Sequence, residues 1–140
     1  MTLDSTSSAH WEGDLMSGRG TASLSSGAAA PLAVDWRARS EESGGKTSPE
    51  ELIAAAHATC FSMALSHALG GAGTPPASLD VTATATFVPG TGITEMKLVV
   101  VGDVPGLSAD EFREAAEGAK TGCPVSQALA GNVEITLDVR

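Results

Sequence analysis

Tyrosine is absent from this chain, and aromatic residues of all kinds make up only 4% of its 140 residues. Apolar residues nevertheless account for 42%, which excludes disorder by composition. Alanine supplies much of that share and buries little surface, so a core built by one copy of the chain would be thin. The composition favours a single folded domain over residues 1–140 and points towards an oligomer.

Basic residues are also scarce. The chain has 8 Lys and Arg against 17 Asp and Glu, which gives a formal net charge of −9. A nucleic-acid-binding protein needs cations to neutralise phosphates, and a polybasic membrane-surface protein needs them to meet anionic lipids. The charge balance therefore argues against both classes of partner.

Long apolar runs are missing as well. Residues 1–15 are polar and acidic and lack the apolar run of an export signal. The longest apolar stretch, residues 52–65, is interrupted by His57, Thr59 and Ser62 and is shorter than a membrane span. We expect a cytoplasmic protein with no membrane partner. In that compartment cysteines are more often free, redox-active or metal-bound than joined in a structural disulfide.

Several segments alternate between apolar and polar residues, as strands do. The first two flank a turn at residues 17–20, and Arg37 and Arg39 share the polar face of the third. The middle of the fifth is too apolar to have a solvated face. The predicted strands cover residues 9–17, 20–26, 32–39, 79–87, 93–104 and 133–139.

The clearest helix signals begin at Ser48. This residue suits the N-cap, Pro49 suits the first helical position, and Glu51 falls at the capping-box position. The helix is predicted to end near Leu69. Its apolar residues cover most of the circumference, which indicates a helix buried on most sides. One chain of this length has few elements to enclose it, which again favours an oligomer.

Two further helices are predicted in the last third. Ser108 and Glu111 form a second capping box that opens a helix ending near Lys120, and a short helix starts at Cys123 and ends near Gly131. Strands dominate both ends of the chain, with a buried helix between them, so the pattern as a whole predicts an α+β fold with antiparallel sheets.

Cys60 lies within the apolar helix. A buried thiol usually behaves as a small hydrophobic side chain, and burial raises its pKa. A redox role would need a cation to stabilise the thiolate. His57 lies three residues earlier on the same face, and an arginine would serve better because it cannot deprotonate.

Cys123 has a different setting, at the start of a helix, where unpaired N–H groups favour a thiolate. Local chemistry therefore indicates that Cys123 is the more acidic thiol. The spacing of the cysteines matches no redox or zinc motif. A zinc site made of both cysteines and His57 lacks a fourth ligand, and a hydrolytic Cys–His pair lacks an orienting Asn or Asp.

Three segments carry a family resemblance. They are AHWEGD at residues 9–14, SPEELIAAAHATCFSMALS at 48–66 and GCPVSQAL at 122–129. Together they resemble the OsmC/Ohr family of thiol-dependent peroxidases, and more closely its OsmC (osmotically induced protein C) branch. The resemblance runs over essentially the whole chain. The second and third segments each carry one family cysteine in its expected surroundings.

The resemblance assigns roles to both thiols. It implies that Cys60 is the peroxidatic cysteine and Cys123 the resolving one, which reverses the order given by local chemistry. Glu50, directly after Pro49 and ten residues before Cys60, matches the family glutamate.

The family arginine is matched best by Arg39. Arg37 is predicted to share its strand face, and Arg19 sits in the early loop from which the Ohr branch takes its arginine. The implied role of the arginine is to lower the pKa of Cys60 and to orient the peroxide, with Glu50 holding the guanidinium.

The resemblance further implies an OsmC-like fold, in which antiparallel sheets wrap the buried central helix of each chain of an intertwined homodimer. It also implies no metal or organic cofactor, and reduction by a dithiol, typically of the lipoyl type. The expected function is reduction of organic hydroperoxides to alcohols in oxidative or osmotic stress, through a Cys60 sulfenic acid and a Cys60–Cys123 disulfide. The alternative is a dimeric apolar-ligand-binding protein with incidental thiols. We expect the substrate lining to come from the apolar residues Ile53, Phe61, Met63 and Leu65.

We hypothesise that Glu50 acts on the partner chain's site; the alternative is that it acts within its own chain, with an arginine between Glu50 and Cys60. Ten helical residues separate Glu50 and Cys60 by about 15 Å along the axis, which the two side chains cannot span by direct contact.

Overall fold

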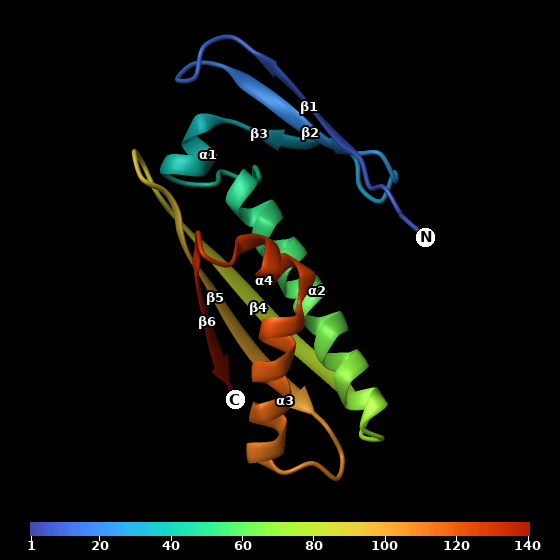
Figure 1. The fold of residues 1–140 in the computed structure, drawn as a ribbon. Coiled ribbons are helices and arrows are strands. Elements are labelled where there is room, and N and C mark those ends of the chain that lie inside the picture. The colour runs from blue at the N-terminus through green and yellow to red at the C-terminus, as the bar shows by residue number, and fades with distance from the viewer. The chain divides into compact units, whose positions relative to one another are not determined.

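The computed structural model describes all 140 residues, which form two compact units, Met1–Leu52 and Ile53–Arg140. The chain mixes strands and helices, as the sequence predicts (Figure 1). In order, the elements are β1 (Ser7–Glu12), β2 (Arg19–Leu24), β3 (Leu32–Val34), α1 (Trp36–Ser40), α2 (Pro49–Gly71), β4 (Ser78–Val88), β5 (Gly92–Asp103), α3 (Ala109–Gly122), α4 (Pro124–Leu129) and β6 (Glu134–Val139).

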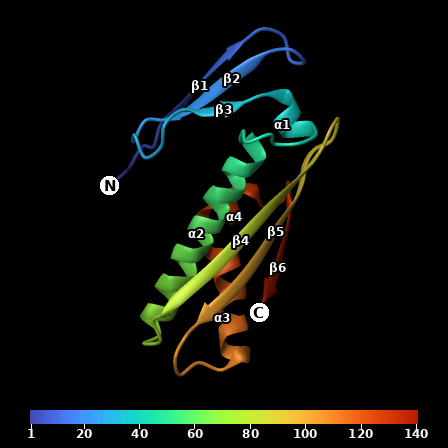
Figure 2. The same ribbon diagram turned by 180° about the vertical axis from the view of Figure 1, so that it is seen from behind.

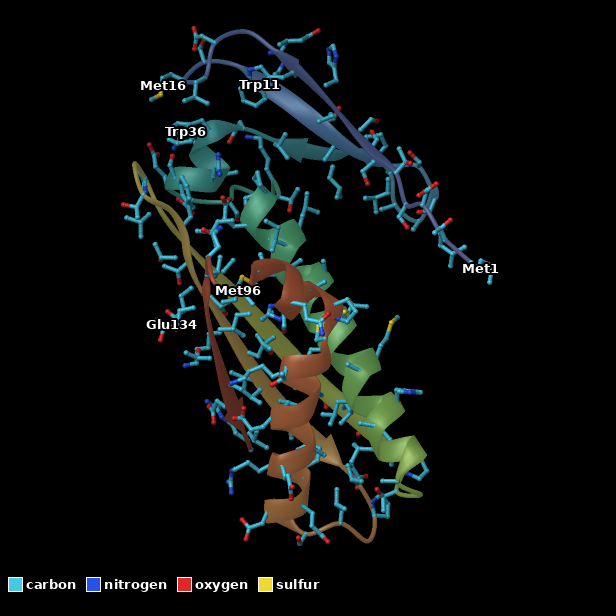
Figure 3. The ribbon with its side chains drawn as sticks, in the orientation of Figure 1. Met1, Trp11, Met16, Trp36, Met96 and Glu134 are labelled. Carbon is cyan, nitrogen blue, oxygen red and sulfur yellow. The ribbon has the colours of Figure 1, made fainter.

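The first unit contains a three-stranded antiparallel sheet in the order β1-β2-β3. Every residue of β1 is exposed, including Trp11, whose ring is labelled in Figure 3. Glu50 is the one buried residue of the unit. This unit therefore has almost no core of its own.

The predicted first strand, residues 9–17, is too long at its end. The Asp14 carboxylate accepts hydrogen bonds from the backbone N–H groups of Met16 and Ser17, at 2.9 and 2.8 Å, and from the Ser17 hydroxyl. These local bonds replace ladder bonds, so the strand stops at Glu12. Gly13, with φ +88°, makes the exit from the strand possible.

The predicted strand over residues 32–39 is wrong beyond Val34. Asp35 is an N-cap whose carboxylate accepts from the backbone N–H of Ala38 at 2.8 Å, and helix α1 follows. Arg37 and Arg39 therefore lie on a helix. Residues two apart on a helix point to different sides, so the two arginines do not share one face.

Helix α2 begins where the sequence predicts. The backbone N–H of Glu51 donates to the Ser48 hydroxyl at 3.1 Å, while the Glu51 carboxylate accepts from the Thr47 hydroxyl. The helix runs to Gly71, two residues past the predicted end.

One face of α2 is buried, and the prediction of burial on most sides is wrong for the single chain. The buried positions in the second unit recur every three or four residues: Ala54, His57, Phe61, Leu65 and Leu69. Met63, on another face, is 68% exposed. By length and composition α2 would also pass as a membrane span, with a mean hydropathy of 1.4, but one face of it forms the core of the second unit.

The second unit has a mixed sheet in the order β4-β5-β6. Strands β4 and β5 are antiparallel, but β6 pairs parallel to β5, which corrects the prediction of purely antiparallel sheets. The reason is the crossover through α3 and α4, which returns the chain to the same end of the sheet. In Figures 1 and 2, α2, α3 and α4 lie on one side of this sheet.

The core of the second unit lies between this sheet and the helices. Strand β5 turns Met96, Leu98 and Val100 inward, while Lys97 and Val101 on its other face are exposed. The prediction that β5 has no solvated face is therefore wrong for the single chain. On α3 the predicted capping box of Ser108 and Glu111 is confirmed. The buried cluster comprises Phe61, Leu65, Leu69, Leu98, Val100, Phe112, Ala116, Ala119 and Cys123.

Candidate functional site

Two free thiols meet in the second unit. Cys60 lies near the middle of α2, and Cys123 lies between α3 and α4, where its backbone N–H donates to the Ala119 carbonyl at 2.8 Å and Pro124 opens the next helix. Their side chains are hydrogen-bonded to each other. Cys60 is partly exposed, whereas Cys123 is fully buried. The fold thus brings the two predicted cysteines together.

The surroundings of the two sulfurs shift their pKa values in opposite directions. Burial raises the pKa of Cys60, and the Cys123 thiol raises it further, against a lowering contribution from the Val125 backbone N–H. Burial also acts to raise the pKa of Cys123. A hydrogen bond from the Ser126 backbone N–H and side-chain hydrogen bonds with the Cys60 thiol and the Ser126 hydroxyl outweigh it, so the pKa of Cys123 is lowered. This order agrees with the prediction from local chemistry.

A histidine lies next to this pair and is linked to it by a serine. His57 Nε2 is 2.8 Å from the Ser126 hydroxyl, and both residues are buried. His57 Nδ1 is buried with no hydrogen-bond partner. Burial lowers the pKa of His57, which favours the neutral imidazole. Sequence reasoning missed Ser126, although its position three residues after Cys123 in GCPVSQAL was a usable signal.

Arg39 and Glu50 form an ion pair in the first unit. Arg39 Nε and Nη2 lie 2.9 and 2.8 Å from the same oxygen, Glu50 Oε1. Both nitrogens thus contact one carboxylate oxygen, and the pair is not a bidentate pair that uses both oxygens. Glu50 Oε2 is buried without a hydrogen-bond partner. The guanidinium carbon lies 5.9 Å from the centre of the Trp36 ring, a cation–π distance.

The other two arginine candidates are placed differently. Arg37 pairs with Glu41 at 3.2 Å, and both side chains are mostly exposed. Arg19 begins β2, opposite Glu12 in the ladder. Of the three arginines, the structure pairs Arg39 with Glu50.

An apolar groove of about 640 Å³ runs past Cys60 between α2 and α3. Small side chains on both helices leave this space open. Of the four residues predicted to line the substrate site, Met63 lines this groove, whereas Phe61 and Leu65 belong to the buried core and Ile53 packs against the cluster that contains Ala54. The groove is lined by Cys60, Met63, Ala64, His67, Ala68, Ala115, Gly118, Ala119, Gly122 and Pro124.

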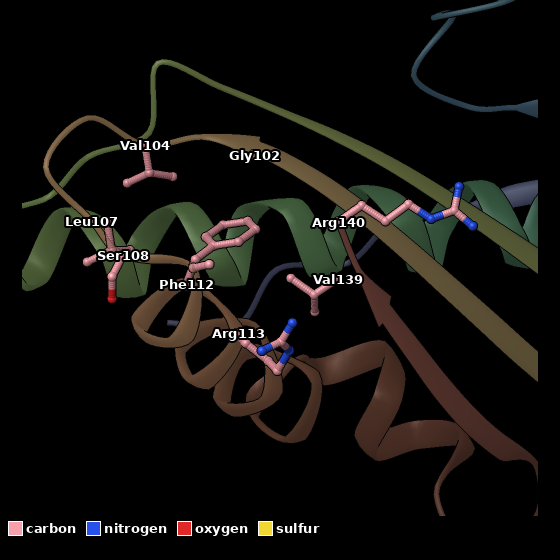
Figure 4. A pocket seen from close by; sticks show the side chains of 9 residues that line it. Gly102, Val104, Leu107, Ser108, Phe112, Arg113, Val139 and Arg140 are labelled. Atoms are coloured by element: carbon pink, nitrogen blue, oxygen red, sulfur yellow. The ribbon is translucent and has the colours of Figure 1, made fainter.

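A smaller hollow of about 270 Å³ lies where the loop after β5 meets α3 and the end of β6 (Figure 4). The Phe112 ring packs directly on Gly102, where any Cβ would collide with it. The two arginines that line this hollow are paired with acidic side chains. Arg113 lies 3.2 Å from Asp110, and Arg140 lies 2.8 Å from Asp138. It contains neither cysteine, so the groove beside Cys60 is the hollow that can combine ligand binding with thiol chemistry.

The thiol pair can alternate between two thiols and a disulfide, because its sulfurs are already neighbours. The partly exposed sulfur borders an apolar groove, and the buried sulfur is the more acidic one. Cys60, Cys123 and His57 do not gather into a metal-binding group.

Comparisons with known proteins place the chain in one family. A family model described as OsmC-like protein matches residues 42–138. Peroxiredoxin OsmC of Escherichia coli (strain K12) is 47% identical over 141 residues, covering 99% of this chain and 96% of the relative. Organic hydroperoxide resistance protein OhrA of Bacillus subtilis (strain 168) is 31% identical over 110 residues, covering 77% of each. A crystal structure described as an organic hydroperoxide resistance protein OsmC from Legionella pneumophila is 25% identical with a TM-score of 0.72, covering 99% of this chain and 98% of that one.

Proposed function

Because the chain belongs to the OsmC family, as its sequence motifs suggest, we propose that it reduces organic hydroperoxides to alcohols by thiol chemistry. It is a cysteine-based peroxidase, as its peroxiredoxin and hydroperoxide-resistance relatives are named. The observation that carries the proposal is the pair of hydrogen-bonded thiols at an apolar groove. The groove suits the alkyl or aryl part of an organic hydroperoxide better than a small polar peroxide.

In the first step the Cys60 thiolate attacks the distal peroxide oxygen. The sulfur–oxygen bond forms as the O–O bond breaks, the alkoxide takes a proton from solvent and leaves as the alcohol, and Cys60 becomes a sulfenic acid. Cys60 is assigned this step because its sulfur is partly exposed and lines the groove, whereas Cys123 is fully buried.

In the second step the Cys123 thiolate attacks the Cys60 sulfur. The S–S bond forms, the S–O bond of the sulfenic acid breaks, and the departing hydroxide is protonated to water. An external dithiol, of the lipoyl type, then reduces the disulfide by two exchange steps and is itself oxidised to a disulfide. The existing thiol–thiol contact supports this pairing because little movement is needed.

The raised pKa of Cys60 within its own unit indicates that a cation must be supplied for a reactive thiolate. We assign this role to Arg39, whose guanidinium stays charged. Trp36 and Glu50 fix its position. Glu50 is buried, and its second oxygen has no partner in the single chain. This leaves Glu50 one oxygen with which to orient a further donor.

The active form is proposed to be an intertwined homodimer in which residues 1–140 form one domain, located in the cytoplasm. The first unit has almost no core, and α2 leaves an apolar face open with Met63 on it. A second copy of the chain would cover both. Glu50 and Cys60 lie ten residues apart on one continuous helix, so we propose that Glu50 serves the partner's Cys60.

The test is steady-state turnover of cumene hydroperoxide with dihydrolipoamide as the reductant. The proposal predicts catalytic formation of cumyl alcohol, at one dithiol consumed per peroxide. Tight binding of apolar ligands without peroxide consumption would overturn it in favour of a ligand-binding protein with incidental thiols.

A further inference from the structure

His57 is a buried histidine that the thiol cycle above leaves without a task. It belongs to a chain of contacts that starts at Cys60, passes through Cys123 and Ser126, and ends at the imidazole. Its three inner members, Cys123, Ser126 and His57, are at most 4% exposed. Solvent therefore has little direct access to the proton of Cys123.

The imidazole itself is placed at a cost to the fold. A buried polar nitrogen without a hydrogen-bond partner is destabilising, and His57 Nδ1 is such an atom. In neutral imidazole one ring nitrogen carries a proton and the other accepts one. In the tautomer that carries its proton on Nδ1, Nε2 presents a lone pair to the Ser126 hydroxyl, and the serine can deliver a proton to it.

We infer that His57, acting through the Ser126 hydroxyl, takes up the proton of Cys123 when this thiol attacks the Cys60 sulfenic acid. His57 does not touch a reacting sulfur, so it is a positioning residue that acts through Ser126. The inference rests on the proposed function, because only that cycle requires Cys123 to lose and regain a proton here.

The proton transfers balance over one cycle. The Cys123 proton passes to Ser126 Oγ while the serine proton passes to His57 Nε2, so the serine ends unchanged. The Cys123 sulfur forms the S–S bond, and the hydroxide expelled from Cys60 takes a proton from solvent on the exposed side. When the dithiol later attacks Cys60, Cys123 leaves as a thiolate and recovers its proton from the imidazolium by the reverse path.

Charged groups do not compete for this role. Burial is the one cause of the lowered pKa of His57. Helix α4 carries no titratable side chain. On β5, Glu95 is engaged by the Thr136 hydroxyl at 3.3 Å and Lys97 is exposed. On α3, Lys120 pairs with Glu117 at 3.0 Å.

On β6, Asp138 pairs with Arg140 at 2.8 Å and Glu134 is exposed, and on β4 Asp80 is exposed. The two thiols are therefore the titratable groups linked to His57.

The test compares wild type with His57→Gln, whose amide can keep a hydrogen bond to Ser126 but cannot hold the proton. One equivalent of cumene hydroperoxide is mixed with reduced protein, and samples quenched by acid are alkylated and weighed by mass spectrometry. This separates sulfenic acid formation on Cys60 from disulfide formation. His10→Gln, which removes an exposed histidine of the first unit, is the matched control.

The inference predicts that His57→Gln forms the sulfenic acid at the wild-type rate but the disulfide at least about tenfold more slowly at pH 7. The disulfide rate of the variant should rise with pH up to the pKa of Cys123, whereas the wild-type rate levels off once His57 is neutral. His10→Gln should match wild type in both steps. Equal disulfide rates and pH profiles for wild type and His57→Gln would overturn the inference.

The serine provides a second variant pair in case His57→Gln does not fold. Ser126→Ala should slow disulfide formation, and Ser126→Thr should restore it because the hydroxyl returns. Ser126→Ala with a wild-type disulfide rate would overturn the relay. Failure of the proposed function looks different, since the wild-type protein itself would then form neither sulfenic acid nor disulfide with the peroxide.

Discussion

Filling the groove beside Cys60 should lower kcat/KM for large organic peroxides and leave kcat/KM for small peroxides nearly unchanged. Gly118 lies on the groove side of α3, and a Cβ built there meets no atom within 4 Å. Gly118→Leu therefore projects an apolar side chain into the space where the organic part of the substrate is proposed to bind. The substitution also replaces a helical glycine with a better helix former, which favours folding by about 0.5–1 kcal/mol.

The size of the effect follows from the apolar surface that the substrate can no longer bury. Burial of one CH₂ group contributes about 0.8 kcal/mol, and the part of the leucine side chain beyond Cβ takes the space of about three such groups. The transition state for cumene hydroperoxide is then destabilised by about 2.4 kcal/mol, which corresponds to a fall of roughly 50-fold in kcat/KM. Hydrogen peroxide has no organic group, so its kcat/KM should change by less than about twofold.

The assay measures kcat/KM for both peroxides with the same dithiol. Gly70→Leu is the matched control, because Gly70 lies on α2 outside the groove and its Cβ position is also open. Native mass spectrometry checks that the variants keep the wild-type oligomeric state. Equal losses toward both peroxides, or no loss toward cumene hydroperoxide, would refute the assignment of the groove to substrate.

Three other predictions concern the arginine, the glutamate and the histidine. Arg39→Ala should raise the pKa of Cys60, read from alkylation rate against pH, and should slow its oxidation, while Arg37→Ala behaves as wild type; the reverse result would move the role to Arg37. A heterodimer of one Glu50→Ala chain and one Cys60→Ser chain should recover about half of wild-type activity if Glu50 acts across the dimer. The reason is that one of its two sites then has both an intact Glu50 and an intact Cys60. Inactive heterodimers would place Glu50 in its own chain's site. The folded-state pKa of His57 is lowered below its ordinary value of 6.5, so the folded state binds fewer protons and the free energy of unfolding should fall as pH drops below about 6.5. Denaturant melts at pH 7 and pH 5 should show that the free energy of unfolding falls less for His57→Gln than for wild type. An equal fall in the two proteins would contradict the assignment of this pH dependence to His57.

The parts of the fold that depend on local chemistry follow from the sequence. The start of α2 at Ser48 and Pro49 is fixed by bonds within a few residues, and so is the capping box of Ser108. The more acidic character of Cys123 follows from its own hydrogen-bonding neighbours in the same way. For the two helix starts, and for the Ser126 contribution to Cys123, the interacting residues lie within four positions, so spacing alone reveals them; the Cys60 contribution to Cys123 comes from 63 positions away.

The third predicted strand shows where local pattern becomes ambiguous. Alternating apolar and polar residues continue past Val34, yet Asp35 caps a helix instead. A segment of this length is compatible with both the strand period of two residues and the helical period of about 3.6. The side chain of one aspartate decides between strand and helix. The helix also sets the pairing of the arginines, because Arg39 contacts Glu50 while Arg37 contacts Glu41.

Long-range pairings were not predictable from spacing. The parallel pairing of β6 with β5 depends on the crossover through two helices, and an alternating strand pattern carries no direction. His57 and Ser126 lie 69 positions apart and meet only because α4 packs on α2. The resemblance supplied the two cysteines but did not point to this link.

Which sulfur reacts first is the central question, because the chemistry of the single chain makes Cys123 the more acidic thiol while exposure and groove position favour Cys60. The direct measurement adds one equivalent of cumene hydroperoxide to each single cysteine variant, with a 1,3-dione present to trap sulfenic acid for mass spectrometry. The account predicts that Cys123→Ser consumes the peroxide and carries the trapped adduct on Cys60, whereas Cys60→Ser consumes none. An adduct on Cys123 in Cys60→Ser, with an unreactive Cys123→Ser, would contradict it.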